Sequence, residues 1–162
     1  MARQSRRSAR VMVFAAPLLL LTACGEATVT EPTEAASEDQ LAANKQLVLD
    51  MWHEVIDGRN IEAARKYMAP DYKQNSPSAP DGLEALIAFL HTEFPDSEPL
   101  EPGTYPLTDF EFVLAEGDLV QLMFQREIPD PHAEGKTIKV WWYDTYRVAD
   151  GKITEHWDSA LE

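Results

Sequence analysis

The chain has 162 residues, of which 26% are charged and 44% hydrophobic, a composition typical of one globular domain with short additions. Its formal net charge is −14, and the residues from position 24 onward carry 10 basic against 28 acidic side chains, a net charge of −18. Such a surface argues against nucleic-acid binding and against docking on anionic lipid through a basic patch. The single cysteine excludes an internal disulfide and any multi-cysteine metal site.

The first 23 residues have the pattern of a secretory signal. Met1–Arg10 is basic, and the apolar run Val11–Thr22 is shorter than the about 20 residues that a membrane-spanning helix needs. The stretch Leu21-Thr22-Ala23-Cys24-Gly25 then resembles a bacterial lipobox. This resemblance implies cleavage before Cys24, lipidation of its thiol with fatty acyl chains such as palmitate, and an extracytoplasmic protein anchored in the bacterial cell membrane. The alternative is a buried cysteine at the start of a helix.

The segment after the cysteine is expected to be a tether over residues 24–40. Gly25–Glu38 is rich in Thr, Ala, Pro and Glu and has almost no large apolar residue. Such a composition cannot bury enough surface to offset the entropy of the chain. We therefore predict a flexible acidic segment that separates the lipid from a folded domain over residues 41–162.

Three helices are predicted in the first half of that domain. Ser37 has the spacing to Gln40 of a capping box, and apolar residues recur at helical spacing after it until Gly58 ends the pattern. A short second helix is predicted over Ile61–Tyr67, with Asn60 as its cap. A third is predicted over 83–94, where proline follows at once.

After residue 102 the apolar period changes from helical spacing to two, which indicates strands. Asp150-Gly151 is a strong hairpin turn, and Glu116-Gly117-Asp118 is a second turn. Helices followed by an antiparallel sheet predict an α+β fold. The four predicted strands are Leu107–Ala115, Leu119–Ile128, Thr137–Ala149 and Lys152–Leu161.

Three stretches together resemble the SnoaL-like branch of the nuclear transport factor 2-like superfamily. The last of them is close to the pattern Asp-x-Phe-Arg…Gly-Lys-Ile-x-Glu-His-Trp-Asp, and the middle one is close to Tyr-x-Gln-His-Asn-Pro…Asp-Gly. The resemblance covers residues 41–162. The three stretches are Asn44–Arg59, Tyr72–Gly82 and Asp144–Asp158.

The resemblance implies a cone-shaped fold in which three N-terminal helices pack on a curved, mainly antiparallel sheet around an apolar pocket, often in a homodimer. Relatives include polyketide cyclases that close rings by aldol chemistry, isomerases, dehydratases and epoxide hydrolases. They use pocket Asp and His residues as acid and base, without metal or another cofactor. Many relatives have no known activity, so the fold does not settle the function.

The chain departs from the family pattern at its histidines. The family histidine of the middle stretch falls on Asn75, and a frequent His-x-His pair falls on Met123 and Gln125 when counted from the Gly117-Asp118 turn. An asparagine forms hydrogen bonds but cannot accept a proton near neutral pH. The chemistry has therefore moved to other residues, or this protein binds a ligand without reacting.

A two-residue turn at Asp150-Gly151 makes Ala149 pair with Lys152 and fixes the faces of the last hairpin. The more apolar face then includes Asp144 and Glu155 and is predicted to face the core. Two inward carboxyls would raise at least one pKa and supply an acid or a base. The alternative is an ion pair with Lys or Arg at the sheet edge. The full set is Trp142, Asp144, Tyr146, Val148, Ile153, Glu155 and Trp157.

The opposite face of the hairpin carries His156 and Asp158, two residues apart. They are either a proton-shuttling pair at the mouth of the pocket or an exposed or dimer-interface pair on the outer face. A bulge in the last strand would exchange the two faces, and the sequence does not exclude one.

Other residues are candidates for contact with a ligand. Tyr72 and Asn75 would orient the substrate, or they would cap the turns of their segment. Trp142 and Trp157 would form an apolar ligand wall, or they would pack in the core. No two histidines have a metal-ligand spacing, so a metal site is not expected, and the resemblance implies no other cofactor.

These observations favour a lipid-anchored extracytoplasmic protein whose pocket takes a small hydrophobic molecule. In the catalytic hypothesis Asp144, Glu155, His156 and Asp158 share the acid and base roles of an aldol cyclase or isomerase. In the alternative hypothesis the domain is a non-catalytic ligand-binding or dimerisation module at the cell surface. The sequence leaves open whether the protein is an enzyme.

Overall fold

The computed structural model describes residues 36–95 and 98–159, all within the second of the two units of the chain, Thr33–Glu162. The predicted signal peptide, Cys24 and most of the predicted tether lie outside the described residues. In the part of the chain that is described, none of the helices combines the length and the apolar character that a membrane crossing requires.

The first predicted helix is present and changes its winding near its end. Helix α1 (Glu38–Met51) begins after Ser37, whose Oγ accepts a hydrogen bond from the Gln40 amide at 3.2 Å, as the capping pattern predicts. It continues as a π-helical segment, η1 (Trp52–Asp57), which ends at Gly58. Because α1 starts at residue 38, the last three residues of the expected tether belong to the helix instead.

The second and third predicted helices are also present. The second consists of one 3₁₀ turn, η2 (Ile61–Ala63), and one α-helical turn, α2 (Ala64–Tyr67). The third is α3 (Leu83–Glu93), whose buried side is apolar. The predicted capping role of Asn60 is wrong, because its side chain makes no capping hydrogen bond to η2 and donates to Glu54 instead.

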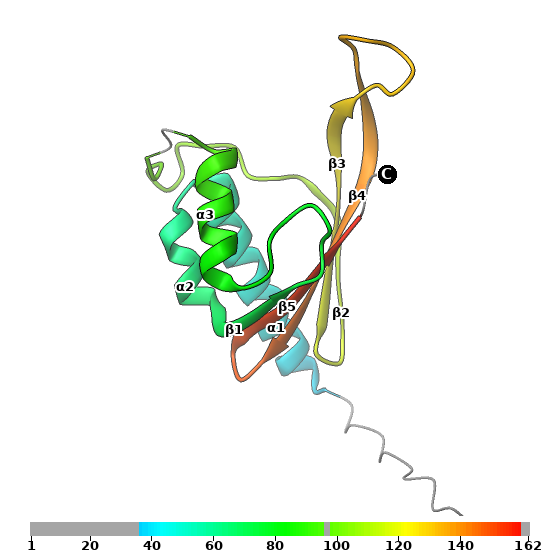
Figure 1. Ribbon diagram of the computed structural model, residues 1–162. Coiled ribbons are helices and arrows are strands. Elements are labelled where there is room, and N and C mark those ends of the chain that lie inside the picture. The colour runs from blue at the N-terminus through cyan, green and yellow to red at the C-terminus, as the bar shows by residue number, and fades with distance from the viewer. Residues whose placement is uncertain (1–35, 96–97, 160–162) are drawn as a thin grey trace, which may run out of the picture. The chain divides into compact units, whose positions relative to one another are not determined.

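A five-stranded sheet lies against these helices, with strand order β1-β5-β4-β3-β2. Every neighbouring pair is antiparallel except β1 and β5, which run parallel. Figure 1 shows the helices on one face of the curved sheet, with the tip of the β3–β4 hairpin reaching beyond them. The strands are β1 (Met68–Gln74), β2 (Phe110–Glu116), β3 (Leu119–Pro129), β4 (Thr137–Ala149) and β5 (Lys152–Asp158).

Strand β1 is not predicted by the sequence analysis, which places only turns between the second and third helices. Its register with β5 shifts between Met68 and Lys73, and Pro70 lies within this irregular part. A proline cannot donate a ladder hydrogen bond, so it is tolerated at a sheet edge such as this one. The strand matters for the site because it buries Tyr72 and Gln74 on the side that faces the helices.

The last hairpin contains the bulge that the sequence left open. Ala149 pairs with Lys152 as predicted, but Arg147 pairs with Glu155, so Thr154 is an extra residue in β5. Because side chains alternate along a strand, one extra residue exchanges the faces of everything after it. The predicted inward positions of Glu155 and Trp157 are therefore wrong, and His156 and Asp158 lie on the inner face.

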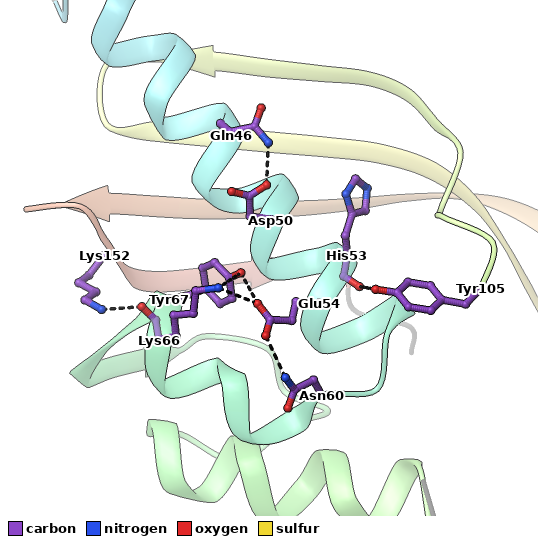
Figure 2. Close-up of polar contacts among 9 residues, drawn as sticks. All are labelled: Gln46, Asp50, His53, Glu54, Asn60, Lys66, Tyr67, Tyr105 and Lys152. Atoms are coloured by element: carbon purple, nitrogen blue, oxygen red, sulfur yellow. Dashed lines mark hydrogen bonds and ion pairs between the residues drawn. The ribbon is translucent and has the colours of Figure 1, made fainter. Parts of the chain in front are cut away.

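A polar cluster joins the helical layer to the end of the sheet (Figure 2). The carboxylate of Glu54 in η1 accepts hydrogen bonds from Asn60 at 2.9 Å, from Lys66 at 2.8 Å and from the Tyr67 hydroxyl. The ammonium group of Lys152, at the start of β5, donates to the backbone carbonyl of Lys66. These contacts fix the chain direction immediately after η1.

The core lies between the helices and the inner face of the sheet. Its central residues are at most 1% exposed, and each aliphatic side chain of this size stabilises the fold by about 1.5–3 kcal/mol when it is fully buried. They come from α1, η1, β3 and β5. The set is Val48, Met51, Val55, Val120, Leu122 and Ile153.

Candidate functional site

A pocket of about 390 Å³ lies between the helical layer and the inner face of the sheet. Most of its wall is apolar, with side chains from the helices on one side and from β3 and β4 on the other. Its polar groups come mainly from β1, β4 and β5. The apolar part includes Met51, Trp52, Val55, Leu86, Leu90, Phe124 and Trp142.

A chain of hydrogen bonds connects Gln74, His156 and Asp144 in the wall of the pocket. His156 is 7% exposed, with Nε2 at 2.8 Å from Asp144 Oδ1 and Nδ1 at 2.9 Å from Gln74 Oε1. The amide orientation of Gln74 is fixed by two further bonds, since Oε1 also accepts from the Ser76 amide at 3.0 Å and Nε2 donates to Tyr72 Oη at 3.2 Å. Because Gln74 Oε1 can only accept, His156 Nδ1 carries a hydrogen.

This tautomer determines the state of the Asp144–His156 pair. With a hydrogen on Nδ1, a neutral His156 presents only a lone pair at Nε2, and a lone pair facing a carboxylate oxygen at 2.8 Å is repulsive. The contact therefore contains one proton, on Asp144 or on His156. Burial raises the pKa of Asp144, whereas the hydrogen bond and charge of His156 lower it. The pair thus holds a transferable proton in the wall of the pocket.

Asp158 provides a second carboxylate beside that pair. It lies opposite Asp144 in the β4–β5 register, and its Oδ1 is buried without a hydrogen-bond partner among the described residues. The negative charge of Asp158 contributes to the raised pKa of Asp144. A protonated pair next to an unpartnered carboxylate is an arrangement in which one site offers a proton and the other accepts one.

Two tyrosines complete the polar wall. The ring of Tyr146 stacks on His156 with centroids 4.5 Å apart and an interplanar angle of 20°. Burial, reinforced by the charge of Asp144, raises the pKa of both Tyr146 and Tyr72 well above the usual value. Both hydroxyls therefore stay protonated, and the Tyr72 hydroxyl, which lines the pocket, can donate a hydrogen bond to a ligand oxygen.

The same group of residues could also hold a metal ion. Asp144, His156 and Asp158 offer one ligand atom each, and these atoms all lie within 4.8 Å of one another. The histidine spacings typical of metal sites do not reveal this group, because its ligands come from two strands and only one of them is a histidine. However, Nε2 of His156 and Oδ1 of Asp144 bond to each other, so a metal would have to displace their shared proton. Its three ligands are one fewer than the four of a structural zinc site and equal the number of protein ligands at a catalytic one.

Glu155 is placed differently from its predicted role. Its side chain is 20% exposed on the outer face of the sheet, with carboxylate oxygens 3.8 Å from Lys73 Nζ and 3.7 Å from Arg147 Nε. This is the ion pair at the sheet edge that the sequence offered as the alternative. Of the two carboxyls predicted to face the core, only Asp144 does so, and the predicted rise in pKa is found there.

Two other candidates, Asn75 and Trp157, make contacts within the protein and do not line the pocket. Asn75 Nδ2 donates to Glu155 Oε1 at 3.0 Å and to the backbone carbonyl of His156 at 3.1 Å, so its side chain holds β5 in place. Trp157 lies on the outer face, with the Arg147 guanidinium 5.4 Å from its ring centroid. Tyr72 and Trp142 do line the pocket.

The positions at which the sequence comparison expected a histidine pair are on the outer face. Met123 pairs with Tyr143 and Gln125 with Trp141, whereas Phe124 and its partner Trp142 face the pocket. Counting from the Gly117-Asp118 turn therefore places the expected histidine pair one residue away from the positions that line the pocket. Arg126, which does line the pocket, places its guanidinium 4.4 Å from the centroid of the Trp142 ring.

Sequence reasoning did not identify Gln74 as the partner of His156, and it placed Tyr146 on the inner face without a role in the site. It also gave Arg59 and Arg126 no place in the pocket wall. The alternation of buried Tyr72 and Gln74 with exposed Lys73 was the available signal for a strand that lines the pocket.

The chain has clear matches among known families and structures. The SnoaL-like domain family matches residues 49–156, whereas no curated protein matches the chain. A candidate SnoaL-like polyketide cyclase from Jannaschia sp. CCS1 has a TM-score of 0.57 and 22% identity, covering 76% of this chain and 89% of its own. A candidate polyketide cyclase from Acidithiobacillus ferrooxidans has a TM-score of 0.52 and 24% identity, with coverages of 72% and 87%.

A structure with a different chemical description shares the fold. An LEH-like epoxide hydrolase from Mycobacterium tuberculosis has a TM-score of 0.51 and 13% identity, covering 73% of this chain and 82% of its own. At these identities the likeness shows the α+β fold that the sequence predicted, and the chemistry has to be argued from the site.

Proposed function

Because the chain belongs to the SnoaL-like domain family, we propose that its pocket binds a small, largely apolar molecule and moves a proton on it with protein side chains as acid and base. The observation that carries this proposal is the 2.8 Å contact between His156 Nε2 and Asp144 Oδ1 beside Asp158 Oδ1, which is buried without a partner among the described residues. The apolar wall supports a hydrophobic ligand, because it offers few polar partners.

The proposed step is a proton transfer at a carbon next to a carbonyl group. Asp158 takes the proton from that carbon, and the Asp144–His156 pair gives its proton to the carbonyl oxygen, so that an enol forms and the total number of protons is unchanged. The Tyr72 hydroxyl donates to the same oxygen. In an aldol closure the enol carbon bonds to a second carbonyl carbon, the oxygen of that carbonyl takes the proton from Asp158, and the enol oxygen returns its proton to the Asp144–His156 pair. In an isomerisation of a conjugated ligand, Asp158 gives its proton to another carbon while the enol oxygen returns its proton to the pair.

Hydrogen–deuterium exchange tests this step without knowledge of the natural substrate. Cyclic ketones that raise the melting temperature of the protein are incubated with it in D₂O, and NMR follows the loss of the proton next to the carbonyl. We expect exchange faster than in protein-free buffer at equal pD. Ligands that bind but exchange at the buffer rate would contradict catalysis and favour the second function.

That second function is ligand binding without turnover. It is favoured by the absence of the family histidines, since Asn75 occupies the first of those positions and holds β5 rather than facing the pocket. Under this function the Asp144–His156 pair is a polar anchor for a ligand, and the exchange experiment separates the two functions.

We further propose that the domain is held at the outer side of a bacterial membrane by lipid on Cys24. The lipobox-like stretch that precedes Cys24 supports this proposal. Cys24→Ser is expected to move the expressed full chain from the detergent phase to the aqueous phase in Triton X-114 partitioning, because the hydroxyl cannot carry the thioether-linked lipid. A conservative substitution outside the lipobox, Ser37→Thr, is the control. Equal partitioning of Cys24→Ser and the native chain would contradict the anchor.

A homodimer is also proposed, with the outer face of the sheet as its interface. Support comes from large apolar side chains on this face, including Leu114, Trp141 and Tyr143, which are 54%, 45% and 38% exposed. Trp141→Glu is expected to convert the dimer to a monomer in light scattering, because two like charges would be buried in the interface. Asp50→Asn, at an exposed carboxylate of α1, is the control. A native chain that is monomeric at 100 µM would contradict the proposal.

A further inference from the structure

Arg59 is a charged member of the pocket that the proton-transfer step does not use. It follows η1 and belongs to the helical side of the pocket, whereas Asp144, His156 and Asp158 belong to the sheet. Its guanidinium carbon lies 3.6 Å from the centroid of the Phe94 ring, at the end of α3. This stacking orients the guanidinium plane but supplies no hydrogen-bond acceptor.

The guanidinium of Arg59 has unused hydrogen-bonding capacity. Its Nη1 is buried and has no hydrogen-bond partner among the described residues. The adjacent carboxylate, Asp57, is engaged elsewhere, since Oδ2 accepts from the Thr108 amide at 3.0 Å and Oδ1 accepts from the Thr108 hydroxyl at 2.6 Å. A buried donor on a charged group without an acceptor is unfavourable, so a ligand acceptor at this point would be bound strongly.

The backbone holds Arg59 in an uncommon conformation. Its φ is +58°, in the left-handed region that non-glycine residues seldom adopt. Asn60 on one side is fixed by two hydrogen bonds to Glu54, one from its amide at 3.0 Å and one from its side chain at 2.9 Å (Figure 2). Gly58 on the other side accepts from the Leu100 amide at 2.8 Å.

The close packing at Gly58 completes this support. A Cβ at Gly58 would lie 2.6 Å from the Tyr105 hydroxyl and 2.9 Å from the Glu54 carbonyl, so the glycine is needed for close approach. Local strain that neighbouring contacts hold in place is a feature of residues that act on ligands. Arg59 is therefore positioned before any ligand arrives, which reduces the entropy lost on binding.

We propose that Arg59 is the anchor for an anionic oxygen of the ligand, so that the pocket takes a small apolar carboxylic acid. The carboxylate pairs with the guanidinium of Arg59, the carbon skeleton lies along the apolar wall, and the far end of the ligand reaches Asp144 and His156. This inference rests on the proposed function for the existence of a ligand, and it adds the chemical class of that ligand.

The other charges of the site make this assignment specific. Asp144 and Asp158 would repel a carboxylate placed beside them. The pocket has two arginines, but Arg126 is exposed and lies near Asp144, whereas Arg59 has a buried donor without a partner among the described residues, so the charge of an acid is expected to be directed toward Arg59. A neutral ligand oxygen could accept from the Arg59 donor, but without a negative charge it would form a weaker hydrogen bond than a carboxylate. The pocket thus favours a molecule that is anionic at one end and uncharged at the other.

Matched acids and amides test the proposal directly. The probes are phenylacetate, 2-naphthylacetate and biphenyl-4-acetate, each paired with its neutral primary amide, and calorimetry measures binding to the native protein and to Arg59→Gln. We expect the native protein to bind the best acid at least tenfold more tightly than its amide, and Arg59→Gln to reduce that preference to about twofold or less. A charge-assisted hydrogen bond is the reason for the size of this effect.

Three variants serve as comparisons. Arg65→Gln, an exposed arginine paired with Glu62 and Glu84, is expected to keep the native preference. Arg59→Lys is expected to recover part of it, which shows that charge and not shape is responsible. If Arg126→Gln lost the preference for acids and Arg59→Gln kept it, the carboxylate would bind Arg126 and not Arg59, and the inference would be overturned.

The outcomes separate this inference from the proposed function. Equal binding of acids and amides by the native protein would overturn the anionic anchor while leaving a ligand-binding pocket in place. Failure of all three acids to bind would also overturn the anionic anchor, whereas the exchange experiment with cyclic ketones decides the proposed function independently. Asp96→Asn examines an acidic residue that lies two positions after Phe94 in the sequence and outside the described ranges. An increase in acid affinity in that variant would identify Asp96 as a competitor for Arg59, whereas a preference unchanged by the substitution supports the ligand carboxylate as the partner.

Discussion

Asp144→Asn is expected to lower the rate of carbon-bound proton exchange about 10³-fold while the protein keeps its fold and its affinity for ligands. The substitution changes one oxygen to an amide nitrogen and leaves the shape of the side chain almost unaltered. Because Gln74 keeps a hydrogen on His156 Nδ1, the new amide can donate to the lone pair at Nε2. The hydrogen bond survives, but its proton can no longer be transferred.

The same variant is expected to change how stability depends on pH. The pKa of Asp144 is raised in the folded protein, so the folded state binds this proton more tightly than the unfolded chain does. That contribution is complete below the ordinary aspartate value of about 3.9 and is lost as the pH rises through the folded value. Asparagine does not titrate, so the free energy of unfolding of Asp144→Asn, relative to that of the native protein, should increase as the pH increases.

Urea unfolding at pH 4.5 and pH 8 measures this gain. We expect the difference in unfolding free energy, variant minus native, to be more positive at pH 8 than at pH 4.5, because the native protein loses the contribution of the raised Asp144 pKa over this range. Asp50→Asn, at an exposed carboxylate of α1, is the control and should show no such change. A difference that becomes more negative at pH 8 would contradict a raised pKa at Asp144.

The elements that the sequence predicted well are those with a long or strongly bounded pattern. The strand Thr137–Ala149 is found with its predicted bounds, because thirteen residues and a tight turn at Asp150-Gly151 leave little freedom. Helix α3 is found because a clear apolar stripe ends at a proline. The α+β fold follows from these patterns and from the family resemblance together.

The parts that could not be predicted depend on single residues. Thr154 reads as an ordinary strand residue, yet its insertion into the β4–β5 ladder reverses the roles of Glu155 and His156. No local property of the sequence distinguishes the two registers. In both, the inner face of the hairpin has apolar residues and β5 contributes one carboxyl to it, Glu155 in the predicted register and Asp158 in the observed one. Arg59 also has no sequence signal, since its backbone conformation is set by contacts of its neighbours with Glu54 and Leu100.

The largest loss of stability is expected for His156→Ala, which should lower the free energy of unfolding by about 3 kcal/mol. The imidazole is buried, with hydrogen bonds to Gln74 and Asp144 and with the ring of Tyr146 stacked on it. Its removal leaves Asp144 Oδ1 without its hydrogen bond, leaves one acceptor site of Gln74 empty, and creates a cavity under the ring of Tyr146. His91→Ala, at an exposed histidine that contacts only Glu62, should cost about 0.5 kcal/mol or less.

A double variant shows how much of that loss comes from the stranded carboxyl. Without His156, Asp144 loses the hydrogen bond and the charge of His156, which both lower its pKa, so its folded value rises further and the loss of stability with increasing pH extends to higher pH. Adding Asp144→Asn to His156→Ala should therefore restore more of the unfolding free energy at pH 8 than at pH 4.5, as measured by urea unfolding. Additive effects of the two substitutions at both pH values would mean that Asp144 and His156 do not share a proton, because groups joined by such a contact must be coupled.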